Sequence, residues 1–152
     1  SRQGAVVEDI VLSTSMALEA AGHKLGHREG EEATYRNGWP TTATYGYRCL
    51  HTLALPLEDI AESTVGLARA MARNYNWVKH PERGEFPEYS QTLLISLVNR
   101  WVVRLVALTL TGSADRLLAP HREPQSMWHL RQRFEDHQLL ITDDGTWKRR
   151  VG

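Results

Sequence analysis

The chain has 152 residues, 41% of them hydrophobic and 24% charged, which predicts one domain with its own core. Lysine plus arginine equals aspartate plus glutamate at 18 each, so a broad basic field for nucleic acid is excluded, although local patches are not. Cys49 is the single cysteine, which excludes an internal disulfide. We expect it to be a small buried side chain in a reducing compartment.

The first half of the chain is predicted to hold two helices separated by polar loops. Apolar residues recur at helical spacing over residues 5–22, which predicts the first helix. Residues 27–44 are rich in Gly, Glu, Asn, Thr and Pro and predict a loop, whereas residues 45–55 fit either a strand or a helix. A second helix is predicted from Pro56 to about Asn74, because proline is tolerated in a first helical turn and an apolar face follows it.

Residues 92–111 are predicted to form the central helix of the molecule. The run is long enough to cross a bilayer, but Asn99, Arg100 and Arg104 disfavour a membrane span. On a helical projection, apolar side chains cover most of the circumference and leave one polar stripe. The stripe contains Ser96, Arg100, Arg104, Ala107 and Thr111. We therefore expect an all-α bundle, a single domain over residues 1–152, in which other helices wrap this one.

The C-terminal third is predicted to contain a loop at residues 80–88, a short helical turn at 114–119 and a helix that starts near Met127. Beyond that helix, an acidic pair and a glycine precede Trp147, which follows Trp128 by nineteen residues.

This tail resembles the second homology segment of the Bcl (B-cell lymphoma) family of apoptosis regulators, including the separation of the two tryptophans. The run Arg104-Leu105-Val106-Ala107-Leu108 resembles the first homology segment, with Val103 in place of the usual small residue. Residues 53–60 give a loose version of the third, or death, segment without its glycine. Residues 18–22 resemble the end of the family's first helix.

The resemblance implies a pro-survival apoptosis regulator, without enzymatic activity or a cofactor, that captures death-motif helices of pro-apoptotic proteins in a hydrophobic groove. Arg104 would donate to a ligand aspartate and Arg100 to a second acid. The expected groove residues are Ile60, Thr64, Ala68, Met71, Ile95, Arg100, Arg104 and Ala107. The alternatives are core packing for the apolar members and, for Arg104, an internal salt bridge to Asp59, Glu58 or Asp115.

The resemblance also implies a cytoplasmic protein, with the mitochondrial outer membrane as a second location if a membrane anchor follows Gly152. Pore-forming killers of the same fold belong to the family, and the missing glycine of the death segment favours the survival role. Asp143 or Asp144 is expected to cap a helix that starts at Gly145, and Trp147 to pack over the bundle. No nucleic-acid partner is expected.

A different class of protein fits the same C-terminal residues. The helix near Met127, followed by a β-hairpin over residues 139–151, matches the recognition helix and wing of winged-helix DNA-binding regulators. This alternative requires paired strands after Leu139, whereas the Bcl-like tail requires a helix there.

Two further patterns give little support for a metal site or a catalytic site. Glu19, His23 and His27 would align as metal ligands on an unbroken helix, but two glycines interrupt the run and no fourth ligand follows, so no metal is expected. Arg122 and His129 have a spacing seen in some helical ribonucleases, but a proline lies between them. No nucleophile motif or phosphate-binding glycine loop indicates catalysis.

Overall fold

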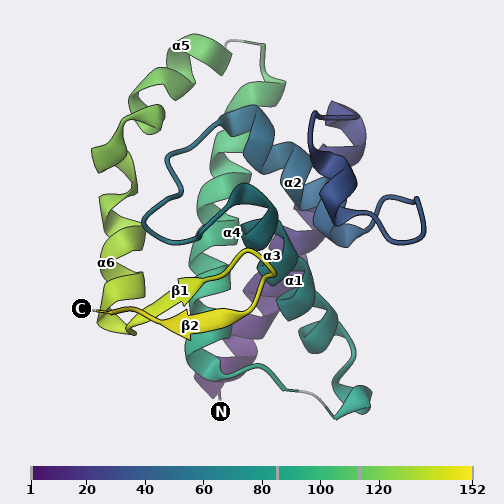
Figure 1. Cartoon of the computed structure of the whole chain (residues 1–152), viewed down its shortest axis with the longest axis vertical. Coiled ribbons are helices and arrows are strands. Elements are labelled where there is room, and N and C mark those ends of the chain that lie inside the picture. Colours follow the sequence, from purple (N-terminus) through teal and green to yellow (C-terminus); the bar gives the residue numbers. More distant parts are fainter. Residues whose placement is uncertain (1, 85, 113, 152) are drawn as a thin grey trace.

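The computed structural model describes residues 2–84, 86–112 and 114–151, most of which lie in helices (Figure 1). The α-helices are α1 (Arg2–Leu25), α2 (Thr42–Leu53), α3 (Thr64–Lys79), α4 (Tyr89–Leu110), α5 (Ala114–Leu118) and α6 (Trp128–Asp136). The 3-10 helices are η1 (Glu31–Thr34), η2 (Pro81–Arg83), η3 (Ala119–Arg122) and η4 (Pro124–Met127). One antiparallel hairpin follows, formed by β1 (Leu139–Ile141) and β2 (Trp147–Arg149). The expected all-α bundle is confirmed.

The helix α4 runs through the middle of the bundle, as predicted, and contacts α1, α2, α3 and α6 (Figure 1). Leu94 and Ile95 are 0% exposed, and Val98 and Val102 are 1% exposed. In the described part of the chain, α4 is the one helix long and apolar enough to cross a membrane. Its packing inside the bundle accounts for this composition. The predicted polar stripe is wrong at Ser96, which is buried and donates from Oγ to the Leu93 carbonyl over 2.6 Å.

The segment before Pro56, which fitted either a strand or a helix, is helical and forms most of α2. Thr41 caps this helix through a reciprocal pair of hydrogen bonds with Thr44. The predicted helix start at Pro56 is wrong. The helix α3 begins at Thr64, because the Ser63 hydroxyl accepts a hydrogen bond from the Gly66 amide over 3.0 Å.

A short strand-like contact occupies the place of the expected first helical turns. The Ile141 amide donates to the Ile60 carbonyl over 3.1 Å, and the Glu62 amide donates to the Ile141 carbonyl over 2.9 Å. Residues 60–62 therefore lie alongside β1 in parallel orientation. This pairing with a residue some 80 positions away holds Ile60 and Ala61 out of a helix.

The predicted helix starting at Gly145 is wrong, because the tail is a hairpin in which Ile141 pairs with Trp147. Gly145 has a φ of 86°, which suits a tight turn and not a helix. The Asp144 Oδ1 accepts from the Thr146 amide over 3.0 Å, so the acidic residue stabilises the turn. Trp147 stacks on Phe134 with 6.0 Å between ring centroids, which agrees with the expected packing role.

The hairpin turn is seated tightly on α3. A Cβ added at Gly66 would lie 2.2 Å from the Thr142 carbonyl oxygen, and one added at Gly145 would lie 2.5 Å from Cβ of Arg69. Glycine is therefore needed on both sides of the contact. Arg69 adds a hydrogen bond of 3.0 Å from Nη1 to the Asp143 carbonyl.

Candidate functional site

Four of the five apolar residues expected to line a peptide groove belong to the core, and Ala107 is the exception. Ile60, Ala68 and Ile95 are 0% exposed, and Met71 is 4% exposed. Ile60 lies in the segment before α3 and not on that helix, and Thr64 is half-buried at the first position of α3. Core packing, the alternative interpretation of the apolar positions, describes where these side chains lie.

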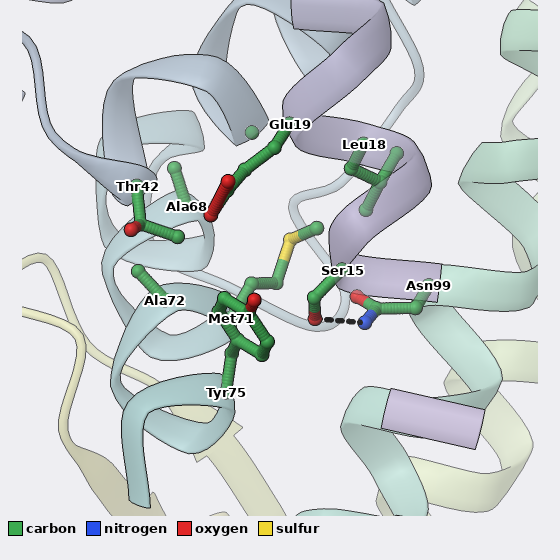
Figure 2. A pocket seen from close by; sticks show the side chains of 10 residues that line it. Ser15, Leu18, Glu19, Thr42, Ala68, Met71, Ala72, Tyr75 and Asn99 are labelled. Carbon is green, nitrogen blue, oxygen red and sulfur yellow. Dashed lines mark hydrogen bonds between the residues drawn. The ribbon is translucent and has the colours of Figure 1, made fainter. Parts of the chain in front are cut away.

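Ala68 and Met71 do border a cavity, but a very small one. Figure 2 shows these two side chains beside Ser15, Leu18 and Asn99. The cavity that the five residues help to line has a volume of about 20 Å³. Nδ2 of Asn99 donates to the Ser15 hydroxyl over 3.2 Å and ties α4 to α1 beside this space. A volume of this size accommodates roughly one water molecule and no peptide side chain.

The remaining groove candidates, Arg100, Arg104 and Ala107, are exposed on one edge of α4. The guanidinium of Arg104 lies 5.8 Å from the centre of the Trp101 ring. Neither arginine forms an ion pair with a carboxylate of the described residues. The structure thus brings these three residues together on a solvent-facing edge and separates them from the four buried candidates.

The two weaker sequence patterns have structural explanations. The ring of His23 stacks on Tyr45 with centroids 4.0 Å apart, and His27 lies 2.7 Å from a carboxylate oxygen of Glu32. No group of three or more His, Cys, Asp or Glu side chains in the described part of the chain is arranged to hold a metal ion. Arg122 donates from Nε to the Leu53 carbonyl over 3.0 Å, whereas His129 packs edge-on against Trp101.

An open cleft of about 680 Å³ lies between α3, the start of α2 and the segment that contains η1. One face of α3 supplies its first wall. That face presents Arg69, Ala72, Arg73, Asn76 and Trp77. Residues 34–36 and 41–43 line the opposite side, and Arg83 and Asp144 complete the lining. We call this feature the arginine cleft.

Two of the four arginines that line the cleft are held in place by carbonyl oxygens. Besides its bond to Asp143, Arg69 donates from Nη2 to the Ala33 carbonyl over 2.6 Å, and Arg73 donates from Nη2 to the Asp144 carbonyl over 3.3 Å. Carbonyl oxygens orient a guanidinium but carry no net charge. Among the described residues, no ion pair with a carboxylate involves any of the four cleft arginines, which are Arg36, Arg69, Arg73 and Arg83.

Among the described residues that line the cleft, Asp144 is the one carboxylate. Hydrogen bonds from the Thr142 hydroxyl and from the hydroxyl and amide of Thr146 hold the pKa of this carboxyl well below its usual range, and the charge of Arg73 lowers it further. Asp144 is therefore ionised at neutral pH and offsets one of four positive charges. The cleft keeps a positive excess in a chain whose formal net charge is zero.

Two aromatic rings and the N-terminus of a helix also line the arginine cleft. Tyr35 is half-buried and donates from its hydroxyl to Oε2 of Glu31 over 2.7 Å, which fixes its ring at the cleft wall. Trp77 contributes a second ring from α3. The first residues of α2 also border the cleft, and the N-terminus of a helix carries a partial positive charge. The arrangement is suited to an anion that also presents flat apolar surfaces.

Sequence reasoning missed this cleft because its arginines are distant in the chain and the total charge is zero. A signal was present in Arg69 and Arg73, which are four residues apart and therefore share the polar face of a predicted helix. The dipeptide Asn37-Gly38 beside Arg36 is a second signal, since it is typical of a tight hairpin turn.

Comparison with known proteins does not assign the chain to a class, since no family model, no curated protein and no solved structure matches it. The Bcl family assignment therefore stays a prediction.

Proposed function

We propose that this protein binds nucleic acid through phosphate groups held in the arginine cleft. The observation that carries the proposal is a set of four arginines, from three segments of the chain, that line one cleft and form no ion pair with a carboxylate of the described residues. Arginine recognises phosphate through planar, charge-assisted hydrogen bonds. Basic grooves that also hold aromatic rings are typical of proteins that bind nucleic-acid strands.

The zero net charge is compatible with this function because the charges are unevenly distributed. Several acidic residues elsewhere are paired with bases, as in the Glu62–Lys148 and Glu135–Arg131 bridges, each 2.8 Å long. Electrostatic attraction to a strand depends on the local field around the cleft, which water and salt screen within about 10 Å. A distant acidic residue therefore weakens binding in the cleft very little.

The winged-helix alternative gains the paired strands that it required, but its wing is not free. The turn of the hairpin is acidic at Asp143 and Asp144, and it is packed against α3 at Gly66. The hairpin does carry the basic residues that this alternative would use for phosphate contacts, but Lys148 forms an ion pair with Glu62 and Arg150 with Glu135. We therefore place the proposed phosphate contacts in the cleft and not on the hairpin.

Capture of a death-motif helix stays an alternative that comes from the resemblance alone. Its predicted apolar anchors are buried, and its predicted charge, Arg104, lies on the exposed edge of α4. The two functions depend on different arginines, so one set of variants separates them.

The experiment measures fluorescence anisotropy of a labelled 20-nucleotide single strand, a duplex of the same length and a death-motif peptide. The test variant combines Arg36→Gln with Arg83→Gln, because both side chains are exposed and neither forms a hydrogen bond or ion pair with another described residue that would be lost. We expect it to bind the single strand roughly 150-fold more weakly, since two charge-assisted hydrogen bonds of about 1.5 kcal/mol each are removed.

The matched control combines Arg100→Gln with Arg104→Gln and removes the same charge from the exposed edge of α4. It should bind the strand as the wild type does. Equal weakening by both double variants would indicate nonspecific attraction and contradict the cleft. Binding of the peptide but of no oligonucleotide, lost only in the α4 variant, would support the death-motif alternative instead.

A further inference from the structure

The segment that enters the arginine cleft at Arg36 is a rigid hairpin turn. Arg36 and Trp39 exchange two backbone hydrogen bonds of 3.0 Å, one in each direction. The residues between them, Asn37 and Gly38, have φ values of 51° and 80°. Positive φ at both central positions is the geometry of a type I′ turn, for which Asn-Gly is the preferred sequence. The turn is thus specified locally and does not depend on a ligand.

The turn presents a tryptophan to solvent. Trp39 is 75% exposed, although tryptophan is a residue that folded proteins mostly cover. In Figure 1 this dark-blue turn projects from the body of the molecule beside α2. Trp39 does not itself line the cleft, but its backbone is paired with that of Arg36, which does. The tryptophan is therefore anchored directly beside a cleft arginine.

We infer that Trp39 is a stacking platform for an unpaired base, and that the ligand of the arginine cleft is single-stranded nucleic acid. This inference rests on the proposed function and adds the class of strand. A duplex turns its base faces inward, whereas an unpaired strand offers every base for stacking on an aromatic ring. An indole held by a preformed turn loses little conformational freedom when a base stacks on it.

The positions of Arg36 and Trp39 indicate how a bound strand would lie. Arg36 donates to a phosphate inside the cleft, and the base attached to an adjoining nucleotide reaches the exposed face of Trp39. Tyr35, on the other side of Arg36 in the chain, lies inside the cleft. Side chains on both flanks of one phosphate-binding arginine therefore offer apolar surfaces to the strand.

The test compares wild type with Trp39→Ala and Trp39→Phe on labelled 12-nucleotide oligo-dT, on oligo-rU and on an abasic strand of equal charge. Stacking contributes enough that Trp39→Ala should bind oligo-dT about 5- to 150-fold more weakly. Trp39→Phe should restore most of this loss. The abasic strand should bind wild type and Trp39→Ala equally, because it offers phosphates and no base.

Each outcome is decisive. Unchanged affinity of Trp39→Ala for oligo-dT and oligo-rU, with normal binding by wild type, overturns the stacking inference and leaves the cleft intact. Equal loss on the abasic strand also overturns it. If wild type binds none of the three strands, the cleft proposal fails and the stacking inference fails with it. Thermal unfolding should be the same for all three proteins, because Trp39 is exposed.

Discussion

Arg48 of α2 and Glu31 of η1 form a doubly hydrogen-bonded ion pair, with 2.9 Å from Nε to Oε1 and 2.9 Å from Nη2 to Oε2. Glu31 is 0% exposed and also accepts from the Arg28 amide and the Tyr35 hydroxyl. This carboxylate fastens the segment that forms one wall of the arginine cleft to the helical body.

We expect Glu31→Gln to lower the free energy of unfolding by about 3–5 kcal/mol, because it leaves Arg48, whose side chain is only 11% exposed, without its counter-charge. The measurement is urea denaturation followed by circular dichroism. Glu32→Gln is the control, since its exposed partner is His27, and it should leave the midpoint unchanged. Equal midpoints for the two variants would contradict the structural role given to Glu31.

The same pair predicts a pH dependence. Burial alone would raise the pKa of Glu31, but hydrogen bonds from Arg48, Tyr35 and Arg28 outweigh it and lower the pKa from 4.5 to about 2. A lowered pKa in the folded state stabilises the protein above pH 4.5, and this contribution is lost as the pH falls toward 2. Wild type should lose about 3 kcal/mol more than Glu31→Gln over this interval. Parallel pH profiles of the two proteins would argue against the shift.

Two helical glycines should respond oppositely to alanine. Gly66→Ala places a Cβ 2.2 Å from the Thr142 carbonyl oxygen and should destabilise the fold by about 1–3 kcal/mol. At Gly46 of α2, the nearest atom to a new Cβ is Cε of Met71 at 4.0 Å. Gly46→Ala should therefore stabilise the fold by roughly 0.5–1 kcal/mol through helix propensity. Thermal or urea unfolding of both variants checks the pair, and a stabilised Gly66→Ala would mean that the hairpin does not sit on α3.

Cys49 should be unreactive in the folded protein. It is 0% exposed, and burial raises the pKa of its thiol to about 12. A disulfide reagent at pH 8 should titrate essentially no thiol in the native protein and one thiol per chain after unfolding in urea. Rapid stoichiometric reaction of native protein would contradict the burial.

Periodicity in the sequence was enough to predict the helical class and the central helix, because α4 carries apolar residues along its whole length. It also predicted the shorter α6, from the helical spacing of Leu130 and Phe134. It failed at Pro56, where Leu57 and Ile60 have helical spacing and are buried, but residues 60–62 pair with the distant Ile141 of β1. It also failed at Gly145. An acidic residue before glycine suits either a helix cap or a hairpin turn, and the contact with Gly66 that accompanies the hairpin is not local.

The candidate site was harder to predict from the sequence than the fold. Its arginines lie at positions 36, 69, 73 and 83, and only the second and third are related by helical spacing. A cleft between three segments depends on how they pack, whereas a zero net charge conceals any local excess. Arg104, which the polar stripe of α4 singled out, is exposed as predicted, but Ile60, Ala68, Met71 and Ile95, expected to form the groove with it, are in the core.

The most direct test of phosphate binding in the cleft is the salt dependence of oligo-dT affinity between 50 and 200 mM salt. For single strands, the slope of log K against log salt concentration is about −0.7 for each phosphate contacted, so four arginines predict a slope of about −3. The variant with Arg36→Gln and Arg83→Gln should show a slope shallower by about 1.4, and the Arg100→Gln, Arg104→Gln control should keep the wild-type slope. A wild-type slope near zero, or the same slope in all three proteins, would contradict phosphate recognition by the arginine cleft.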